Sequence, residues 1–181
     1  MLRACERNDF KEAQRRVALA KFLGECFNFR VVHTSTLFEA LYRLINERCH
    51  EHMKATDSPQ DSFRIRLVCT TLDSLGKGHF QRGPRRKMMD RFLMYFQRYI
   101  YSKSYVLMDL EFMVLDTFDS LRPALIKFQT PEEAEKACEF IAQREAAGLD
   151  IQDVLGSYQK DGGGYELSYY CLLYTSPSPR D

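Results

Sequence analysis

The sequence predicts an all-α fold in which about six helices form three antiparallel pairs, stacked as a HEAT-like helical-hairpin solenoid. Apolar residues recur at helical spacing in six separate segments. No segment keeps the two-residue alternation that is typical of a half-buried strand. The helix pairs begin near Lys11, Asp61 and Leu107, a period of roughly 45 to 50 residues that suits HEAT-like repeats.

The composition is that of a globular domain. The chain has 181 residues, of which 45% are hydrophobic and 13% aromatic, enough for one domain with a sizeable core. Its 26 basic and 25 acidic residues leave a net charge of +1, so the overall charge does not predict binding to nucleic acid or to a membrane. Acidic residues interrupt the apolar stretches well before the ~20 residues of a membrane span. Any function that depends on charge must therefore be local.

The first pair of helices occupies the N-terminal quarter of the chain. One helix is expected between Glu12 and Phe29, followed after a short link by a second helix that begins with a capping box of Thr36 and Glu39. The short link predicts antiparallel packing. The apolar face predicted for the first helix consists of Leu19, Phe22, Leu23, Cys26 and Phe27, and that of the second of Leu37, Leu41, Leu44 and Ile45.

The second pair follows a polar stretch at 50–60. Gly76 is expected to cap the end of its first helix, and Gly83 with Pro84 to open the next one. The aromatic face of this fourth helix should bury a large area, which makes it the predicted central helix of the core. The two apolar faces are Ile65, Val68, Cys69, Leu72 and Leu75, and then Met88, Phe92, Tyr95, Phe96 and Tyr99.

The third pair has the clearest boundaries. Its first helix should end at Arg122, because the residue before a proline is pushed out of helical geometry. Its second helix should start at Thr130, which is followed by a first-turn proline and two glutamates, and end at Gly148. The two apolar faces are Leu110, Met113, Val114, Phe118 and Leu121, and then Ala134, Ala137, Cys138 and Ile141.

The sequence divides into three parts. Residues 1–148 form the predicted helical scaffold, which we expect to be incomplete at its start because the first helix begins almost at residue 1 with nothing before it to cap the stack. Residues 149–170 are predicted to be a flexible linker with a glycine-rich run. Residues 171–181 resemble the translation of a sequencing-library adapter, with a natural disordered tail as the alternative.

The sequence contains no catalytic signature, so it predicts neither an enzyme nor a cofactor. The residues Cys, His, Glu and His at 49–52 could supply metal ligands, but two more would have to come from elsewhere, such as His33 or His79. A polar helix end explains them equally well, so no metal is predicted. The six cysteines lack a Cys-x-x-Cys pair and are expected to be reduced and packed as small hydrophobes. The N-terminus lacks a secretory signal, which predicts an intracellular location.

A local basic cluster precedes and opens the fourth helix, with His79 nearby. Cations at a helix N-terminus oppose the helix dipole, so their concentration there indicates a use such as holding the phosphates of RNA. The alternative is an ordinary solvated loop. The candidate RNA-contacting residues are Arg82, Arg85, Arg86, Lys87 and Arg91.

Five sequence strings resemble one family. It is the regulator-of-nonsense-transcripts-two family. Members of this family contain repeats of a domain type named after the middle domain of initiation factor four G, and the strings resemble the third of these repeats. The resemblance covers about residues 1–145 and implies a HEAT-like, armadillo-type scaffold of nonsense-mediated mRNA decay. The strings are RRVALAKFLGE at 15–25, LFEALY at 37–42, FRIRLVCTTLD at 63–73, RFLMYFQRY at 91–99 and LRP at 121–123.

The resemblance also implies partners. It implies that the scaffold bridges the helicase Upf-one to Upf-three at exon junction complexes. The implied location is the cytoplasm, including its perinuclear part. Within the scaffold, this domain is implied to dock the RNP-type domain of Upf-three and to contact RNA. The family docks Upf-three through acidic residues, and one of them matches Glu6, which lies at the same distance from the residues at 14–16 as in the family. The other acidic docking residues of the family would lie upstream of residue 1. The Upf-one-binding segment would lie downstream of the matched region. The alternative function is an RNA-binding helical-repeat domain of another mRNA-processing or translation factor, which would use the basic cluster.

Overall fold

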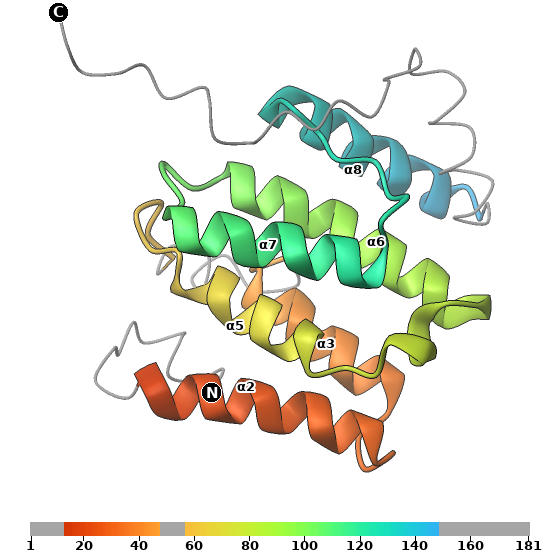
Figure 1. Cartoon of the computed structure of the whole chain (residues 1–181). Coiled ribbons are helices and arrows are strands. Elements are labelled where there is room, and N and C mark those ends of the chain that lie inside the picture. Colours follow the sequence, from red (N-terminus) through yellow and green to blue (C-terminus); the bar gives the residue numbers. More distant parts are fainter. Residues whose placement is uncertain (1–12, 48–56, 149–181) are drawn as a thin grey trace, which may run out of the picture.

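A computed structural model describes residues 13–47 and 57–148 of the chain. Over these residues the structure is all helical, as predicted, with six α-helices, one short 3-10 helix and no strand (Figure 1). The elements are α2 (Ala13–Asn28), α3 (Thr34–Leu44), α5 (Phe63–Asp73), η1 (Lys77–Phe80), α6 (Gly83–Tyr101), α7 (Met108–Leu121) and α8 (Pro131–Ala146).

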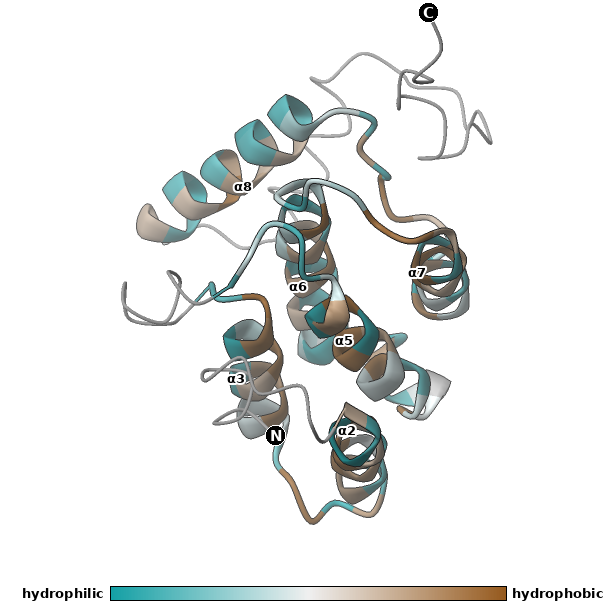
Figure 2. Ribbon diagram, turned by 90° about the vertical axis from the view of Figure 1, so that its left-hand side faces the viewer, coloured by the Kyte–Doolittle hydropathy of each residue, from teal (hydrophilic) through white to brown (hydrophobic). Residues whose placement is uncertain are grey.

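The helices form two layers. Helix α2 packs against α5, and α5 against α7, which makes one layer; α3 contacts α6, and α6 packs against α8, which makes the other. Figure 2 shows the layers nearly end-on, with α8, α6 and α3 in one column and α7, α5 and α2 in the other. Each layer takes one helix from each pair, so the predicted stack of helical hairpins is confirmed.

Helix α6 is the central helix of the core, as its aromatic face predicts. Phe92 and Phe96 are fully buried. The ring of Phe96 stacks on Phe118 of α7 at a centroid distance of 6.2 Å, and the ring of Phe92 meets Phe38 and Tyr42 of α3 edge to face. Aromatic contacts from α6 therefore reach both layers, and each pair adds about 0.5–1.5 kcal/mol beyond the area that it buries.

The apolar face predicted for the first helix is wrong in part. Leu19 and Phe22 are 39% and 64% exposed, whereas Ala20 and Gly24 are buried in the layer that α2 shares with α5. A Cβ atom at Gly24 would lie 2.1 Å from Ser74 Oγ. Small residues let the two helix backbones approach closely, and this turns the larger apolar side chains of α2 outward.

Two predicted helix boundaries also differ from the structure. Thr36 lies inside α3, which begins at Thr34 after His33, and no side-chain hydrogen bond caps this end. Gly76 is not a left-handed cap: α5 ends at Asp73, and Gly76 has a φ of −63°. The amide of Gly76 donates to Asn28 Oδ1 at 2.9 Å, so this residue ties η1 to the end of α2.

The boundaries of the last helix are confirmed. The amide of Glu133 donates to Thr130 Oγ1 at 3.3 Å, and Pro131 occupies the first turn of α8. Gly148 follows the helix with a φ of +73°, the left-handed conformation that glycine adopts at little cost. Local capping chemistry is strong enough here to decide where the helix starts and stops.

Candidate anion-binding site

The five predicted basic residues lie at the start and in the first half of α6, in different surroundings. Arg82 and Arg85 are exposed where α6 begins. Nε of Arg86 lies 3.7 Å from Oδ2 of Asp90 on the same helix. Nη2 of Arg91 lies 2.6 Å from Oε2 of Glu145 on α8, and this ion pair joins two helices. Lys87 is half-buried. Two of the five side chains therefore have carboxylate partners within the fold, whereas Arg82 and Arg85 are exposed.

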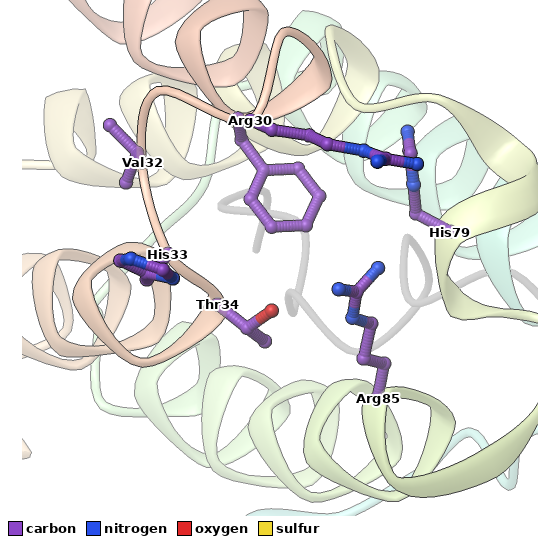
Figure 3. Close-up of a pocket in the computed structure, with 7 residues that line it drawn as sticks. Arg30, Val32, His33, Thr34, His79 and Arg85 are labelled. Atoms are coloured by element: carbon purple, nitrogen blue, oxygen red, sulfur yellow. The ribbon is translucent and has the colours of Figure 1, made fainter.

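Arg85 instead joins cationic residues from other parts of the chain. It lines a pocket of about 420 Å3 together with Arg30 and with two histidines, His33 and His79. Figure 3 shows the guanidinium groups of Arg30 and Arg85 pointing toward the same space, which the hydroxyl of Thr34 also faces. The pocket is formed by the connection between α2 and α3, by η1 and by the first turn of α6. Its other lining residues are Phe27 and Val32.

The end of α2 positions Arg30. The amide of Arg30 donates to the carbonyl of Phe27, and the amide of Val31 to that of Cys26, both at 2.9 Å. These bonds form a Schellman motif in which Arg30 takes the left-handed position, with a φ of 59°. Glycine is the usual residue there, because a side chain in this conformation costs on the order of 1–2 kcal/mol. The helix end thus holds an arginine over the pocket in a strained backbone conformation.

The ring of Phe27 is the floor of the pocket. Phe27 is 4% exposed and stacks on Phe80 of η1 with their centroids 5.4 Å apart. The His79 ring meets its edge at 5.4 Å, and Cζ of Arg85 lies 6.0 Å from its centroid. Phe80 in turn contacts Phe38 of the core. Packing against a buried aromatic ring therefore positions both Arg85 and His79.

The pocket has an uncompensated cationic character. None of its seven lining residues is acidic. Within the part of the chain that the structure describes, neither Arg30 nor Arg85 forms an ion pair with a carboxylate. The N-terminus of α3 opens at Thr34 without a side-chain cap, so its first amides are further donors beside the pocket. This arrangement is suited to holding an anion.

Burial controls the ionisation of groups in the core rather than at the pocket. It raises the pKa of both the Cys69 and the Cys138 thiol to about 12. These two cysteines therefore stay protonated near neutral pH, consistent with the small hydrophobic residues expected from the sequence. Burial also raises the pKa of the Asp90 carboxyl, although the Arg122 guanidinium, which donates to it, acts in the opposite direction.

Several predicted features lie outside the described residues. They are Glu6, the possible metal ligands at 49–52, the linker at 149–170 and the tail at 171–181. In the described ranges, no group of three or more His, Cys, Asp or Glu residues is arranged to hold a metal ion. None of the helices described is long and apolar enough to cross a membrane.

Sequence reasoning found Arg85 but missed Arg30, and it considered His33 only as a possible metal ligand. These two residues belong to a link that separates two predicted helices, and no motif marks them. Arg30 and Arg85 lie far apart in the sequence, so only the packing of η1 and α6 against the end of α2 brings them together. An arginine directly after a helix C-terminus was the one available signal, and it is weak by itself.

Two layers of stacked helical hairpins define a helical-repeat protein. Residues 3–124 match the model of the MIF4G domain, which is more than half of the chain. The chain therefore belongs to the MIF4G domain family.

Curated relatives narrow the resemblance further. The chain is 38% identical over 143 residues to Regulator of nonsense transcripts UPF2 of Arabidopsis thaliana, and 37% identical over 140 residues to Regulator of nonsense transcripts 2 of Homo sapiens. These matches cover 78% and 71% of the chain. It is also 28% identical over 123 residues, or 64% of the chain, to Nonsense-mediated mRNA decay protein 2 of Saccharomyces cerevisiae. The chain spans only 11% to 12% of the lengths of these relatives.

Proposed function

We propose that this chain is a non-catalytic scaffold module of nonsense-mediated mRNA decay, which needs no cofactor and holds the RNP-type domain of Upf-three. The observation that carries the proposal is the two-layer helical stack, combined with the identity to regulators of nonsense transcripts from a plant and a mammal. A rigid stack supplies long helix surfaces on which a partner's side chains can be matched. We place this function in the cytoplasm at exon junction complexes, with Upf-one engaged through a separate segment.

Glu6 is the docking residue that this proposal names. A carboxylate facing a basic partner surface improves orientation and association rate, and removing one member of a desolvated charge pair costs about 2–5 kcal/mol. A charge reversal at this position adds repulsion to that loss. The effect should therefore appear as a large change in affinity.

The test is binding of the 181-residue chain to a purified Upf-three RNP-type domain, measured by pull-down and by calorimetry. We expect Glu6→Arg to weaken binding at least tenfold, on the order of 1.4 kcal/mol or more. The matched control is Glu39→Arg, because Glu39 is an exposed glutamate of α3 with a partly exposed i,i+4 partner, Arg43. Unchanged binding of the Glu6 variant would remove this residue from the interface.

A second candidate function is direct RNA contact. It is favoured by Arg82 and Arg85, which are exposed together where α6 begins. Neutralising Arg82, Arg85, Arg86 and Lys87 to glutamine should weaken RNA binding and flatten its salt dependence, by about 0.7 in the logarithmic slope for each lost phosphate contact to a single strand. Arg91 is left unchanged, because its ion pair with Glu145 joins α6 to α8. Equal RNA affinity and salt slope in the variant and the parent chain would exclude the cluster.

A further inference from the structure

The geometry of the pocket points to a ligand beyond this proposed function. We propose that the pocket binds the phosphate group of a phosphorylated serine or threonine in a protein partner, and that apolar side chains beside that residue lie on the exposed apolar strip formed by α2 and the residues that follow it. This strip is defined as Leu19, Phe22, Phe29 and Val31. Neither Glu6 nor the Upf-three domain is needed for this interaction.

The charges of the pocket favour a phosphate monoester. Arg30 and Arg85 line the same open pocket from two elements, the end of α2 and the first turn of α6. A phosphorylated side chain carries a charge of about −1.5 to −2 at neutral pH and three acceptor oxygens, whereas each RNA phosphodiester carries a charge of about −1. Two guanidinium groups with no carboxylate among the lining residues match the more highly charged group.

Further side chains of the pocket supply hydrogen-bond donors for the three phosphate oxygens. The hydroxyl of Thr34 faces the space between the two arginines in Figure 3, and the uncapped first turn of α3 begins at this residue. His79 is held at the edge of the pocket by its contact with the Phe27 ring. Donors from three segments thus converge on one anion, which is the arrangement that a single phosphate group needs.

The surface beside the pocket is apolar. Phe29 and Val31, the neighbours of Arg30, are 80% and 72% exposed. Leu19 and Phe22 lie three residues apart on α2, a spacing that places them on one face of that helix, and Phe29 and Val31 follow its end. Exposed apolar side chains next to a cationic pocket complement a peptide with a phosphorylated residue and neighbouring apolar side chains.

A nucleic acid fits this surface less well. A single strand is bound by a groove of cations that follows successive phosphates. Beyond Arg85 along α6, the next arginines have carboxylate partners, Asp90 for Arg86 and Glu145 for Arg91. The cationic surface therefore does not continue as an unpaired row from the pocket, and the apolar strip adjoins it instead.

The experiment measures binding of the 181-residue chain to fluorescent peptide pools by anisotropy. In one pool a central phosphoserine is flanked by random apolar residues, and the second pool has serine in its place; a decauridylate is the RNA probe. We expect the phosphoserine pool to bind at least tenfold more tightly than the serine pool and more tightly than the decauridylate. Equal affinity for both pools, no binding of either, or tighter binding of the decauridylate would overturn the proposal.

Substitutions test whether the pocket is responsible. Arg85→Gln and Arg30→Gly should each weaken phosphoserine binding at least tenfold, with little change for the serine pool. Glycine suits the positive φ at position 30, so the thermal midpoint of that variant should not fall, which separates lost binding from lost folding. Arg43→Gln is the matched control, since Arg43 is exposed at the opposite end of α3 from His33. Full phosphoserine binding by both pocket variants would refute the site.

A final variant tests the strip separately from the phosphate. Phe29→Ser should weaken binding of the apolar-flanked phosphoserine pool severalfold, while leaving unchanged a third pool in which glycine and serine flank the phosphoserine. An equal effect on the two phosphorylated pools would show that the strip takes no part, and would overturn that half of the proposal.

Discussion

Replacing Asp57 with alanine is expected to lower the free energy of unfolding by about 3–5 kcal/mol, because it removes the carboxylate that forms ion pairs with two buried cations, Lys103 and Arg64. Oδ1 of Asp57 lies 2.7 Å from Nζ of Lys103, whose side chain is 2% exposed, and 3.5 Å from Nε of buried Arg64. Its Oδ2 accepts from Asn46 Nδ2 at 2.6 Å and from the Tyr99 hydroxyl at 2.9 Å. Urea unfolding followed by circular dichroism measures the loss.

The matched control is Asp119→Ala. Oδ1 of Asp119 lies 2.6 Å from Nζ of Lys127, nearly the distance of the buried pair, but the two side chains are 52% and 34% exposed. Solvent screening limits such a pair to about 0–1 kcal/mol. Burial and not distance decides the difference, so similar losses for the two variants would contradict this account of the Asp57 network.

Phe92→Ala should cost about 3–5 kcal/mol of unfolding free energy, the usual range for emptying a fully buried phenylalanine site. The Phe92 ring is 0% exposed and lies between helix pairs. Its centroid is 5.3 Å from that of Tyr42, 6.1 Å from that of Phe38 and 5.9 Å from that of Phe96. The truncation leaves a cavity and removes the contacts that join α3 to α6. Denaturant unfolding again provides the measurement.

Phe112→Ala provides the comparison on α7. The Phe112 side chain is 50% exposed, so its truncation leaves no closed cavity and should change stability by no more than about 0.5 kcal/mol. A loss for Phe92→Ala as small as that for Phe112→Ala would show that α6 is not the centre of the core. Phe92 also contacts Phe38, which touches Phe80 and through it the pocket floor, so Phe92→Ala should weaken phosphopeptide binding as well.

The helices and the core could be predicted because their signals are local. A stripe of large apolar residues at helical spacing marks α6 and α7, and the start of α8 is marked by capping chemistry at Thr130. The same reasoning failed for α2, since alanine and glycine count for little in an apolar pattern. Ala20 and Gly24 form the buried face because the helix that packs on them comes close, and this is a property of the pair.

The polar features were harder to predict. Asp57 belongs to a stretch that reads as a solvated loop, yet its carboxylate is 6% exposed among partners from the segment after α3, from α5, and from the end of α6 and the residues that follow it. The five basic residues read as one patch, yet two of them have carboxylate partners within the fold. Charge partners far apart in sequence leave no periodic pattern, so a charged residue's surroundings cannot be inferred from its neighbours in the chain.

The amino-acid sequence by itself determined that this protein is a stack of helical hairpins with an aromatic central helix, and its resemblance to regulators of nonsense transcripts. Only the tertiary structure decided which face of α2 is buried and that Arg30 and Arg85 share one pocket. The physical reason is the distance along the chain over which each feature is determined. Helix formation and burial periodicity depend on residues within a few turns, whereas a binding pocket depends on where separate helices end, and that is set by packing across the whole domain.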